Sequence, residues 1–154
     1  MIRISPSPFD PGGELSVFEK AAGDAGAVVS FLGRVRGEET KAAVTALYLE
    51  HYPGVTERML GELETEARGR WAIAEPLIIH RVGELNPGEP IVFVCVSARH
   101  RRDAFEAADF LMDYLKTKAL FWKKEITSDG ERWIEPRAED YSDAARWNER
   151  DKDN

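Results

Sequence analysis

Cysteine is nearly absent from this sequence, since Cys95 is the single one among 154 residues. A lone cysteine excludes an internal disulfide, which agrees with a reducing compartment. It lies within the apolar run IVFVCVSA, where no basic side chain flanks it. We therefore expect a buried strand residue rather than a reactive nucleophile.

Long hydrophobic runs are also lacking. No segment approaches the roughly 18 apolar residues of a membrane span, and the first five residues do not form the apolar core of a signal peptide. We therefore expect a cytoplasmic protein. With 43% hydrophobic residues, the chain can bury one substantial core, which predicts a single domain.

Net positive charge is lacking, because 28 acidic residues outnumber 21 basic ones and the net charge is −7, which argues against general nucleic-acid binding. The basic residues are unevenly spread. Between Arg99 and Lys124 there are seven basic and four acidic residues, a local balance of +3 that leaves −10 for the rest of the chain. A basic island on an acidic protein favours a small anionic ligand or an acidic chain terminus as its partner.

Hydrophobic periodicity predicts both helices and strands. Helical spacing occurs in residues 13–23, 54–71 and 102–119, which predicts about three helices. Apolar or alternating runs predict strands at 2–6, 26–35, 44–52, 75–85, 90–98, 121–127 and 131–135. We expect 26–35 to pair with 44–52 as a hairpin, and Ser128-Asp129-Gly130 to turn a closing hairpin. Residues 138–154 are polar, and we expect a frayed tail with at most one helical turn near residues 143–147.

The stretch YLKTKALFWKKE, residues 114–125, interleaves lysines with aromatic residues. Lys116 follows Met112 by four positions, which places it at the border of the apolar stripe, whereas Lys118 faces elsewhere. In the strand that follows, Phe121, Lys123 and Glu125 share one face. One lysine from the helix and one from the strand could thus converge, and close ammonium groups lower each other's pKa. The alternative is that these lysines only extend from amphipathic surfaces into water.

A second basic group, Arg99-His100-Arg101-Arg102, stands where the helix at 102–119 begins. Backbone N–H groups at a helix start, together with arginine side chains, form sites for phosphate or carboxylate groups. The alternative is a solvated basic corner offset by Asp103 and Glu106. The other two histidines, His51 and His80, lie in strand-like runs and are expected to be structural.

Five separated blocks resemble the large, catalytic subunit of molybdopterin synthase. They lie in the same order over roughly residues 25–137 and are GAVVSFLGRVR, LEHYPGVTERML, HRVGEL with PGEPIVFV, SARHRRDAFEAADFLMDYLKTKALFWKKE and ERWIEPR. The resemblance implies a single α+β domain of the hammerhead type over residues 1–137, with mostly antiparallel strands. It also implies a homodimer that binds a small ubiquitin-like sulfur-carrier subunit at each end, forming a heterotetramer.

The activity implied by the resemblance is that of a sulfurtransferase in molybdenum cofactor biosynthesis. The substrate would be cyclic pyranopterin monophosphate, and the sulfur would come from a C-terminal Gly-Gly thiocarboxylate on the carrier. No metal and no bound cofactor are expected. The resemblance implies that Lys116 and Lys123 are catalytic. It implies substrate contacts for Arg36, His100, Arg101 and Arg137, the last of these reaching across from the other subunit, and pocket walls at Phe31 and Met112.

The sequence departs from the family pattern at Leu120, where many relatives carry proline, so the helix could extend further toward Lys123. Two other classes of function remain open. One is an enzyme that acts alone on a phosphorylated small molecule, with arginines on the phosphate and a lysine as base. The other is a non-catalytic module that docks the acidic C-terminus of a partner.

Overall fold

A computed structural model describes residues 1–37, 43–119 and 121–150 of the chain, with two sheets and four helices in those ranges. Leu120 and most of the loop after Arg36 therefore lie outside the described residues. The elements in chain order are β1 (Ile2–Ser5), α1 (Pro11–Ala21), β2 (Ala27–Arg34), β3 (Val44–His51), α2 (Val55–Arg70), β4 (Leu77–Arg81), β5 (Gly83–Leu85), β6 (Pro90–Ala98), α3 (Arg101–Thr117), β7 (Phe121–Thr127), β8 (Gly130–Ile134) and α4 (Ala138–Arg150).

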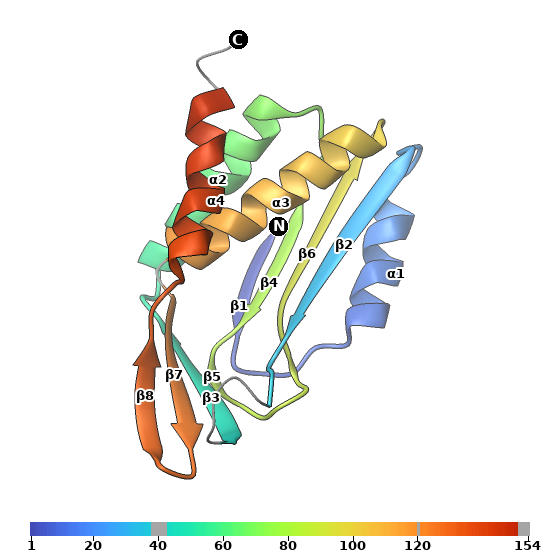
Figure 1. Cartoon of the computed structure of the whole chain (residues 1–154). Helices are drawn as coiled ribbons and strands as arrows, with labels where there is room; N and C mark the ends of the chain where they lie inside the picture. The colour runs from blue at the N-terminus through green and yellow to red at the C-terminus, as the bar shows by residue number, and fades with distance from the viewer. Residues whose placement is uncertain (38–42, 120, 151–154) are drawn as a thin grey trace.

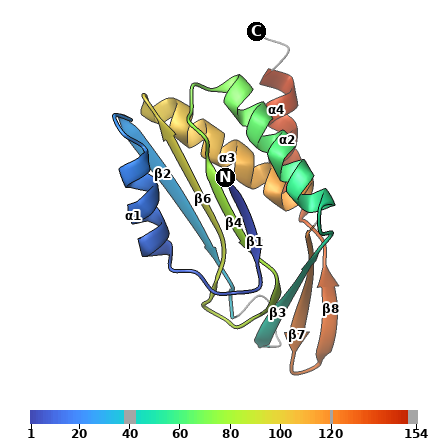
Figure 2. The ribbon, with the colours of Figure 1, turned by 180° about the vertical axis from the view of Figure 1, so that it is seen from behind.

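The larger layer is a four-stranded sheet in the order β1-β4-β6-β2, in which β1 and β4 are parallel and the other pairs antiparallel. Helices α2 and α3 cover one face, and α1 covers the opposite face (Figures 1 and 2). Strands β4 and β6 are apolar on both faces because each face is covered. The fold is thus α+β with mostly antiparallel strands, as the sequence predicted.

The second sheet has the order β5-β3-β7-β8, is antiparallel throughout and extends from one end of the molecule (Figure 1). The predicted hairpin of β7 and β8 is confirmed, with Thr127 paired to Gly130 at the turn. The predicted pairing of residues 26–35 with 44–52 is wrong. Strand β2 pairs with β6, and β3 pairs with β5 and β7, because buried Leu47 and Leu49 pack with Leu85.

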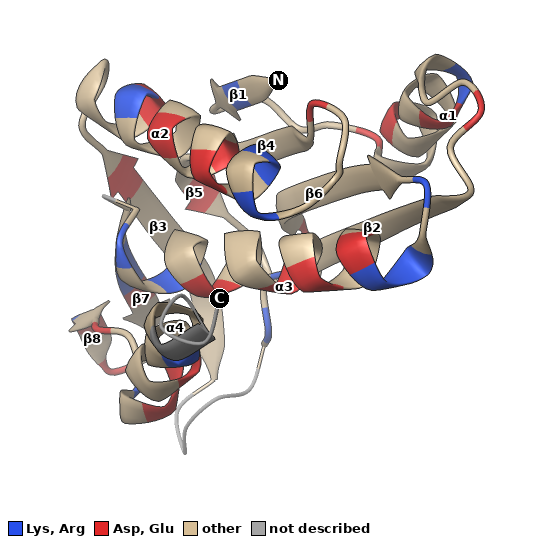
Figure 3. Ribbon diagram, turned by 90° about the horizontal axis from the view of Figure 1, so that it is seen from above, with Lys and Arg blue, Asp and Glu red and all other residues tan. Residues whose placement is uncertain are grey.

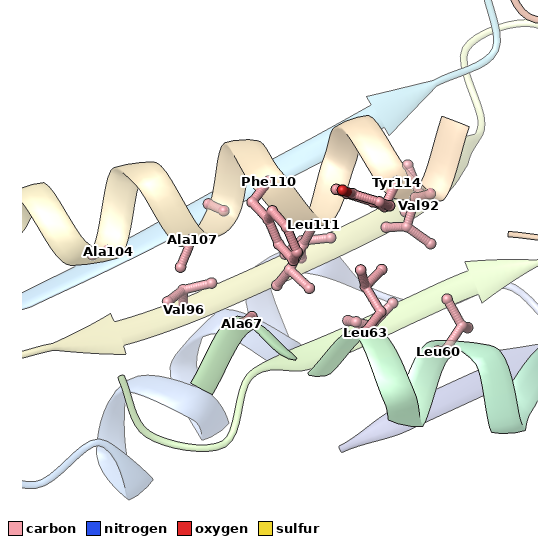
Figure 4. Close-up of a cluster of buried hydrophobic side chains, with 14 of the residues drawn as sticks. Leu60, Leu63, Ala67, Val92, Val96, Ala104, Ala107, Phe110, Leu111 and Tyr114 are labelled. Carbon is pink, nitrogen blue, oxygen red and sulfur yellow. The ribbon is translucent and has the colours of Figure 1, made fainter. Parts of the chain in front are cut away.

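The main core forms where α3 crosses the larger sheet (Figure 4). Alanines at 104 and 107 are fully buried, so the helix backbone approaches the sheet closely. Phe110, Leu111 and Tyr114 fill the space between the sheet and α2. The helix predicted at 102–119 therefore exists as α3. The apolar stripe read from the sequence, Phe105, Ala108, Met112, Leu115 and Ala119, is only partly the buried one, because Phe105 is 61% exposed whereas Ala104, Ala107 and Leu111 are fully buried. Among the described residues, no helix combines the length and apolar character that crossing a membrane requires.

The chain after Arg137 differs from the expectation of a frayed tail with one short turn. Residues 138–150 form α4, a fourth helix where about three were predicted, and it packs on α3 (Figure 1). Its anchor is Trp147, 1% exposed, whose Nε1–H donates to Asp113 at 2.7 Å. The ring of Trp147 also meets Trp71 and Phe110 edge to face, at 5.5 and 5.6 Å between centroids. Arg146 of the same helix adds ion pairs to Asp109 and Asp113 of α3, each at 2.7 Å, so an aromatic ring and a guanidinium group together hold α4 on α3.

Candidate functional site

A cleft of about 680 Å³ opens where the two sheets meet the ends of α3 and α4. Its walls come from the end of β2, the last turns of α3, strands β7 and β8, and the first turn of α4. Segments from residue 31 to residue 143 thus meet in one place. The size is that of a site for a small molecule.

Six of the eight residues that the resemblance marked line this cleft, and they are Phe31, Arg36, Met112, Lys116, Lys123 and Arg137. His100 and Arg101 do not line it in the same chain. They stand at the start of α3, and Lys116 lies near its end, roughly 23 Å away at 1.5 Å per residue. Arg137, which was expected to reach across from another subunit, lines the cleft of its own chain.

Lys116 is held at the mouth of the cleft by a carboxylate of α4. Its Nζ lies 3.1 Å from Oδ1 of Asp140, and its side chain is half exposed. The other oxygen of Asp140 accepts the backbone N–H of Arg137 at 2.8 Å. Burial opposes the charged form of Asp140, but these two hydrogen bonds outweigh it and lower its pKa below the ordinary value. Asp140 therefore stays charged and fixes Lys116 to the first turn of α4.

Lys123 lies on the cleft face of β7, between Phe121 and Glu125. The alternation predicted from the sequence is confirmed, because all three side chains line the cleft. Glu125 is 2% exposed and accepts a hydrogen bond from Arg132 of β8 at 2.7 Å. A buried carboxylate in a cleft is expensive without such a partner. Glu125 thus joins the site, although the sequence analysis gave it no role.

The other two lysines of the stretch are turned elsewhere. The Nζ of Lys118 lies over the ring of Tyr114 at 4.0 Å from its centroid. The Nζ of Lys124 pairs with Glu131 at 2.9 Å and lies over the rings of Tyr48 and Trp133. Neither lines the cleft. Of the four neighbouring lysines, two therefore line the cleft and two lie over aromatic rings outside it.

His80 is a cleft residue that the sequence analysis assigned to a structural role. It is the penultimate residue of β4, is 4% exposed, and stacks on Phe121 with 3.7 Å between ring centroids and 11° between ring planes. Burial lowers the pKa of His80 to about 3, against the hydrogen bond to Arg81 and aided by the charge of Lys123. The ring is therefore neutral at physiological pH. Only the position of His80 within a strand was visible in the sequence, and nothing there marked it as a site residue.

The single cysteine takes no part in the site. Cys95 is fully buried among residues that face α1, and burial raises the pKa of its thiol to about 12. A thiol in that state is a poor nucleophile. The described residues contain no group of three His, Cys, Asp or Glu side chains placed to hold a metal ion.

Charge in the cleft is mixed, and this limits its chemistry. Two lysines and three arginines, Arg34, Arg36 and Arg137, line it, together with acidic side chains from β7, the end of β8 and α4. Figure 3 shows a further basic cluster at the start of α3, where Arg101 does not line this cleft. Cations beside partly buried carboxylates and a neutral imidazole can bind an anion and can move protons. The fold and cleft define an α+β protein with a lysine-containing cleft of mixed charge.

Comparison with known proteins identifies the family. The sequence model described as "MoaE protein" matches residues 4–118. The chain is 51% identical to the molybdopterin synthase catalytic subunit of Escherichia coli, covering 95% of this chain and 97% of the relative. It is 49% identical to that of Pseudomonas aeruginosa, covering 96% and 99%. The molybdopterin biosynthesis MoaE protein of Burkholderia ambifaria has the same fold, with a TM-score of 0.81, 45% identity and coverage of 96% and 97%. The chain belongs to the MoaE family.

Proposed function

We propose that this chain is the catalytic subunit of a molybdopterin synthase, a cytoplasmic sulfurtransferase. It would transfer sulfur from the thiocarboxylated C-terminus of a small carrier protein to cyclic pyranopterin monophosphate, forming the dithiolene of molybdopterin. The observation that carries the proposal is the single cleft in which Lys116 and Lys123 meet Arg36 and Arg137. Family membership and the names of the relatives agree with it.

The division of labour follows from the position of each side chain. Arg36 and Arg137 supply guanidinium groups for the phosphate and for charge that develops during the reaction. Lys123, deeper in the cleft beside Glu125, is the candidate for proton transfer to the pterin. Phe31 and Met112 are apolar walls that limit water. Because the sulfur arrives on the partner, the chain needs no reactive thiol, which agrees with the inert state of Cys95.

Lys116 is the residue proposed to receive the tail of the carrier. A Gly-Gly terminus is narrow enough to enter a cleft in extended form, and its carboxylate needs a cation once water is excluded. The Nζ of Lys116 is half exposed at the mouth and already binds one carboxylate, that of Asp140. A thiocarboxylate can take the same position by exchanging with Asp140.

We also propose a homodimer formed through β2. This strand is an edge of the larger sheet, and Phe31 and Leu32 on it are about two-fifths exposed. An unpaired, apolar edge of eight residues is a template for pairing with another strand. A two-fold axis would pair β2 antiparallel with β2 of a second copy.

That arrangement accounts for His100 and Arg101. The start of α3 lies near the start of β2, because Ala27 pairs with Ala98, and the cleft lies at the other end of β2. The eight residues of β2 span roughly 27 Å. This length is close to the roughly 23 Å along α3 that separates His100 and Arg101 from Lys116. Antiparallel pairing would therefore bring His100 and Arg101 of one copy toward the cleft of the other.

Reconstitution tests the proposed function. Purified chain, thiocarboxylated carrier and cyclic pyranopterin monophosphate should together yield molybdopterin, measured by its fluorescent oxidation product. Chain without carrier is the control and should yield none. Turnover without carrier would instead support an enzyme that acts alone on a phosphorylated molecule, and carrier binding without turnover would support a docking module.

A further inference from the structure

His80 presents a nitrogen atom to the cleft whose chemical state is fixed by its surroundings. The Nδ1 atom lies 2.8 Å from the backbone oxygen of Arg81. A carbonyl oxygen only accepts, so Nδ1 must carry the hydrogen. Because the ring is neutral, Nε2 then carries a lone pair and no hydrogen. The ring is a hydrogen-bond acceptor at Nε2 throughout the physiological pH range.

The orientation of that acceptor is set by packing. The imidazole is stacked face to face on Phe121, two residues before Lys123 on the same face of β7. Within the described parts of the chain, the bond to Arg81 is the one hydrogen bond of the ring, and no side chain donates to Nε2. His80 lines the cleft, so Nε2 is available to a ligand there.

A purely structural role does not require an imidazole at this place. A hydrocarbon ring would stack on Phe121 without the cost of removing two nitrogen atoms from water. Among the described residues, the fully buried side-chain nitrogen and oxygen atoms without a hydrogen-bond partner are Nε of Arg81 and Nε of Arg146, and Nε2 of His80 is not one of them. Nε2 is therefore accessible from the cleft, where a bound molecule can supply the donor.

We propose that Nε2 of His80 accepts a hydrogen bond from an N–H group of the bound pterin and so orients it beside Lys123. This inference rests on the proposed function, since it names how the same cleft recognises its substrate. An acceptor that never protonates suits an uncharged N–H donor. A protonated imidazole would add a cation next to Lys123 and repel that donor.

Three substitutions separate the acceptor from the packing. His80→Phe keeps a ring on Phe121 and removes both nitrogens. His80→Asn places an amide N–H where Nδ1 stood, keeping the bond to Arg81, and removes the acceptor at Nε2. His80→Gln places an amide oxygen near the position of Nε2. His51→Phe is the matched control, because His51 also faces Phe121, at 6.4 Å between centroids, but does not line the cleft.

The measurement is the dissociation constant of cyclic pyranopterin monophosphate for the complete complex with carrier, with KM and kcat measured in parallel. We expect His80→Phe and His80→Asn each to weaken substrate binding about tenfold, equal to about 1.4 kcal/mol. His80→Gln should stay within about threefold of the wild type, and His51→Phe should be unchanged. The affinity for the carrier should not change in any variant.

Several results would overturn the inference. Wild-type affinity in both His80→Phe and His80→Asn would show that Nε2 has no ligand. An equal loss in His80→Gln would show that packing, and not the acceptor, matters. If the His80 variants lost affinity for the carrier and kept their affinity for the substrate, the donor to Nε2 would be an amide of the carrier tail and not the pterin. If the wild-type complex itself failed to bind the pterin, the proposed function would fall as well, and this outcome is distinguishable from the other three.

Discussion

Four lysines lie within nine residues of one another, and what surrounds each ammonium group decides what it can do. Lys116 and Lys123 open into the cleft, whereas the ammonium groups of Lys118 and Lys124 lie over aromatic rings outside it. The interleaving of lysine and aromatic residues in YLKTKALFWKKE therefore has two separate explanations. One pair serves the site, and the other covers apolar surface while keeping its charge in water.

The first prediction concerns these two pairs. Lys116→Ala and Lys123→Ala should each lower turnover at least tenfold, about 1.4 kcal/mol in the barrier, because each removes a cation from the cleft. Lys118→Ala and Lys124→Ala are matched controls and should change turnover less than about twofold. Steady-state formation of molybdopterin measures this. Equal losses at all four positions would indicate a diffuse electrostatic effect and would contradict the division.

The second prediction concerns acid stability. His80 has a folded-state pKa of about 3, below the 6.5 of an exposed imidazole, so the unfolded chain binds a proton that the folded chain does not. The free energy of unfolding should therefore fall as pH drops below 6.5, by about 1.4 kcal/mol per pH unit from this residue. His80→Phe should show a shallower fall between pH 6.5 and 4.5 in denaturant titrations. Identical slopes in both proteins would contradict a buried, neutral His80.

At the scale of elements, the site is built from the ends of secondary structure. The last turn of α3, the cleft face of β7 and the first turn of α4 each contribute charged groups. Asp140 connects two of them, because it binds Lys116 of α3 and the backbone at the start of α4. The position of α4 on the core thus affects how Lys116 is held.

The third prediction tests this connection. Trp147→Ala should lower the free energy of unfolding by about 3–5 kcal/mol, because it removes a ring that is 1% exposed and packed against two other aromatic residues. It should also change carrier affinity, since α4 would no longer hold Asp140 on Lys116, the position that the carboxylate of the carrier takes. Tyr141→Ala is the control on the same helix, where the side chain is 54% exposed and little change is expected. Thermal unfolding and carrier titration give both quantities. Normal carrier affinity in a destabilised Trp147→Ala would show that α4 is independent of the site.

Elements differ in how well the sequence predicts them. Helix α3 and the alternation of β7 were visible because their periods are regular. The stripe read for α3 was only partly right, since it included Phe105, which is 61% exposed. Helix α4 was not expected, because few of its residues are apolar, although its buried positions Ala144 and Trp147 do stand at helical spacing. The strand that pairs with β2 was also predicted wrongly, since an alternating pattern indicates a strand but does not indicate which distant strand pairs with it. His80, Asp140 and Glu125 joined the site only through tertiary contacts.

At the scale of the whole molecule, the proposed dimer makes each site depend on both copies. A light-scattering mass of about 35 kDa, twice the 17.4 kDa of one chain, is expected for the chain without carrier. A monomer at micromolar concentration would contradict this assembly.

The fourth prediction uses mixed dimers. A His100→Ala dimer and a Lys123→Ala dimer should each be nearly inactive, but exchange of subunits creates mixed dimers in which one site carries neither change. With random exchange, half of the dimers are mixed and half of their sites intact, so activity should recover to about a quarter of the wild type. The measurement compares the turnover of the two variants after they are refolded together, which exchanges subunits, with their turnover when they are refolded separately and then mixed. Absence of recovery would show that each chain holds a complete site, and that His100 does not act across the interface.

The central claim is that the cleft at Lys116 receives the carboxyl terminus of the carrier. A zero-length carbodiimide cross-link, mapped by mass spectrometry, measures it most directly, since it joins a carboxylate only to an amine in contact with it. The account predicts an amide between the terminal glycine of the carrier and Nζ of Lys116, lost in Lys116→Ala and in a carrier without its last two glycines. A terminal glycine joined instead to Lys118 or Lys124, with Lys116 unmodified, would contradict it.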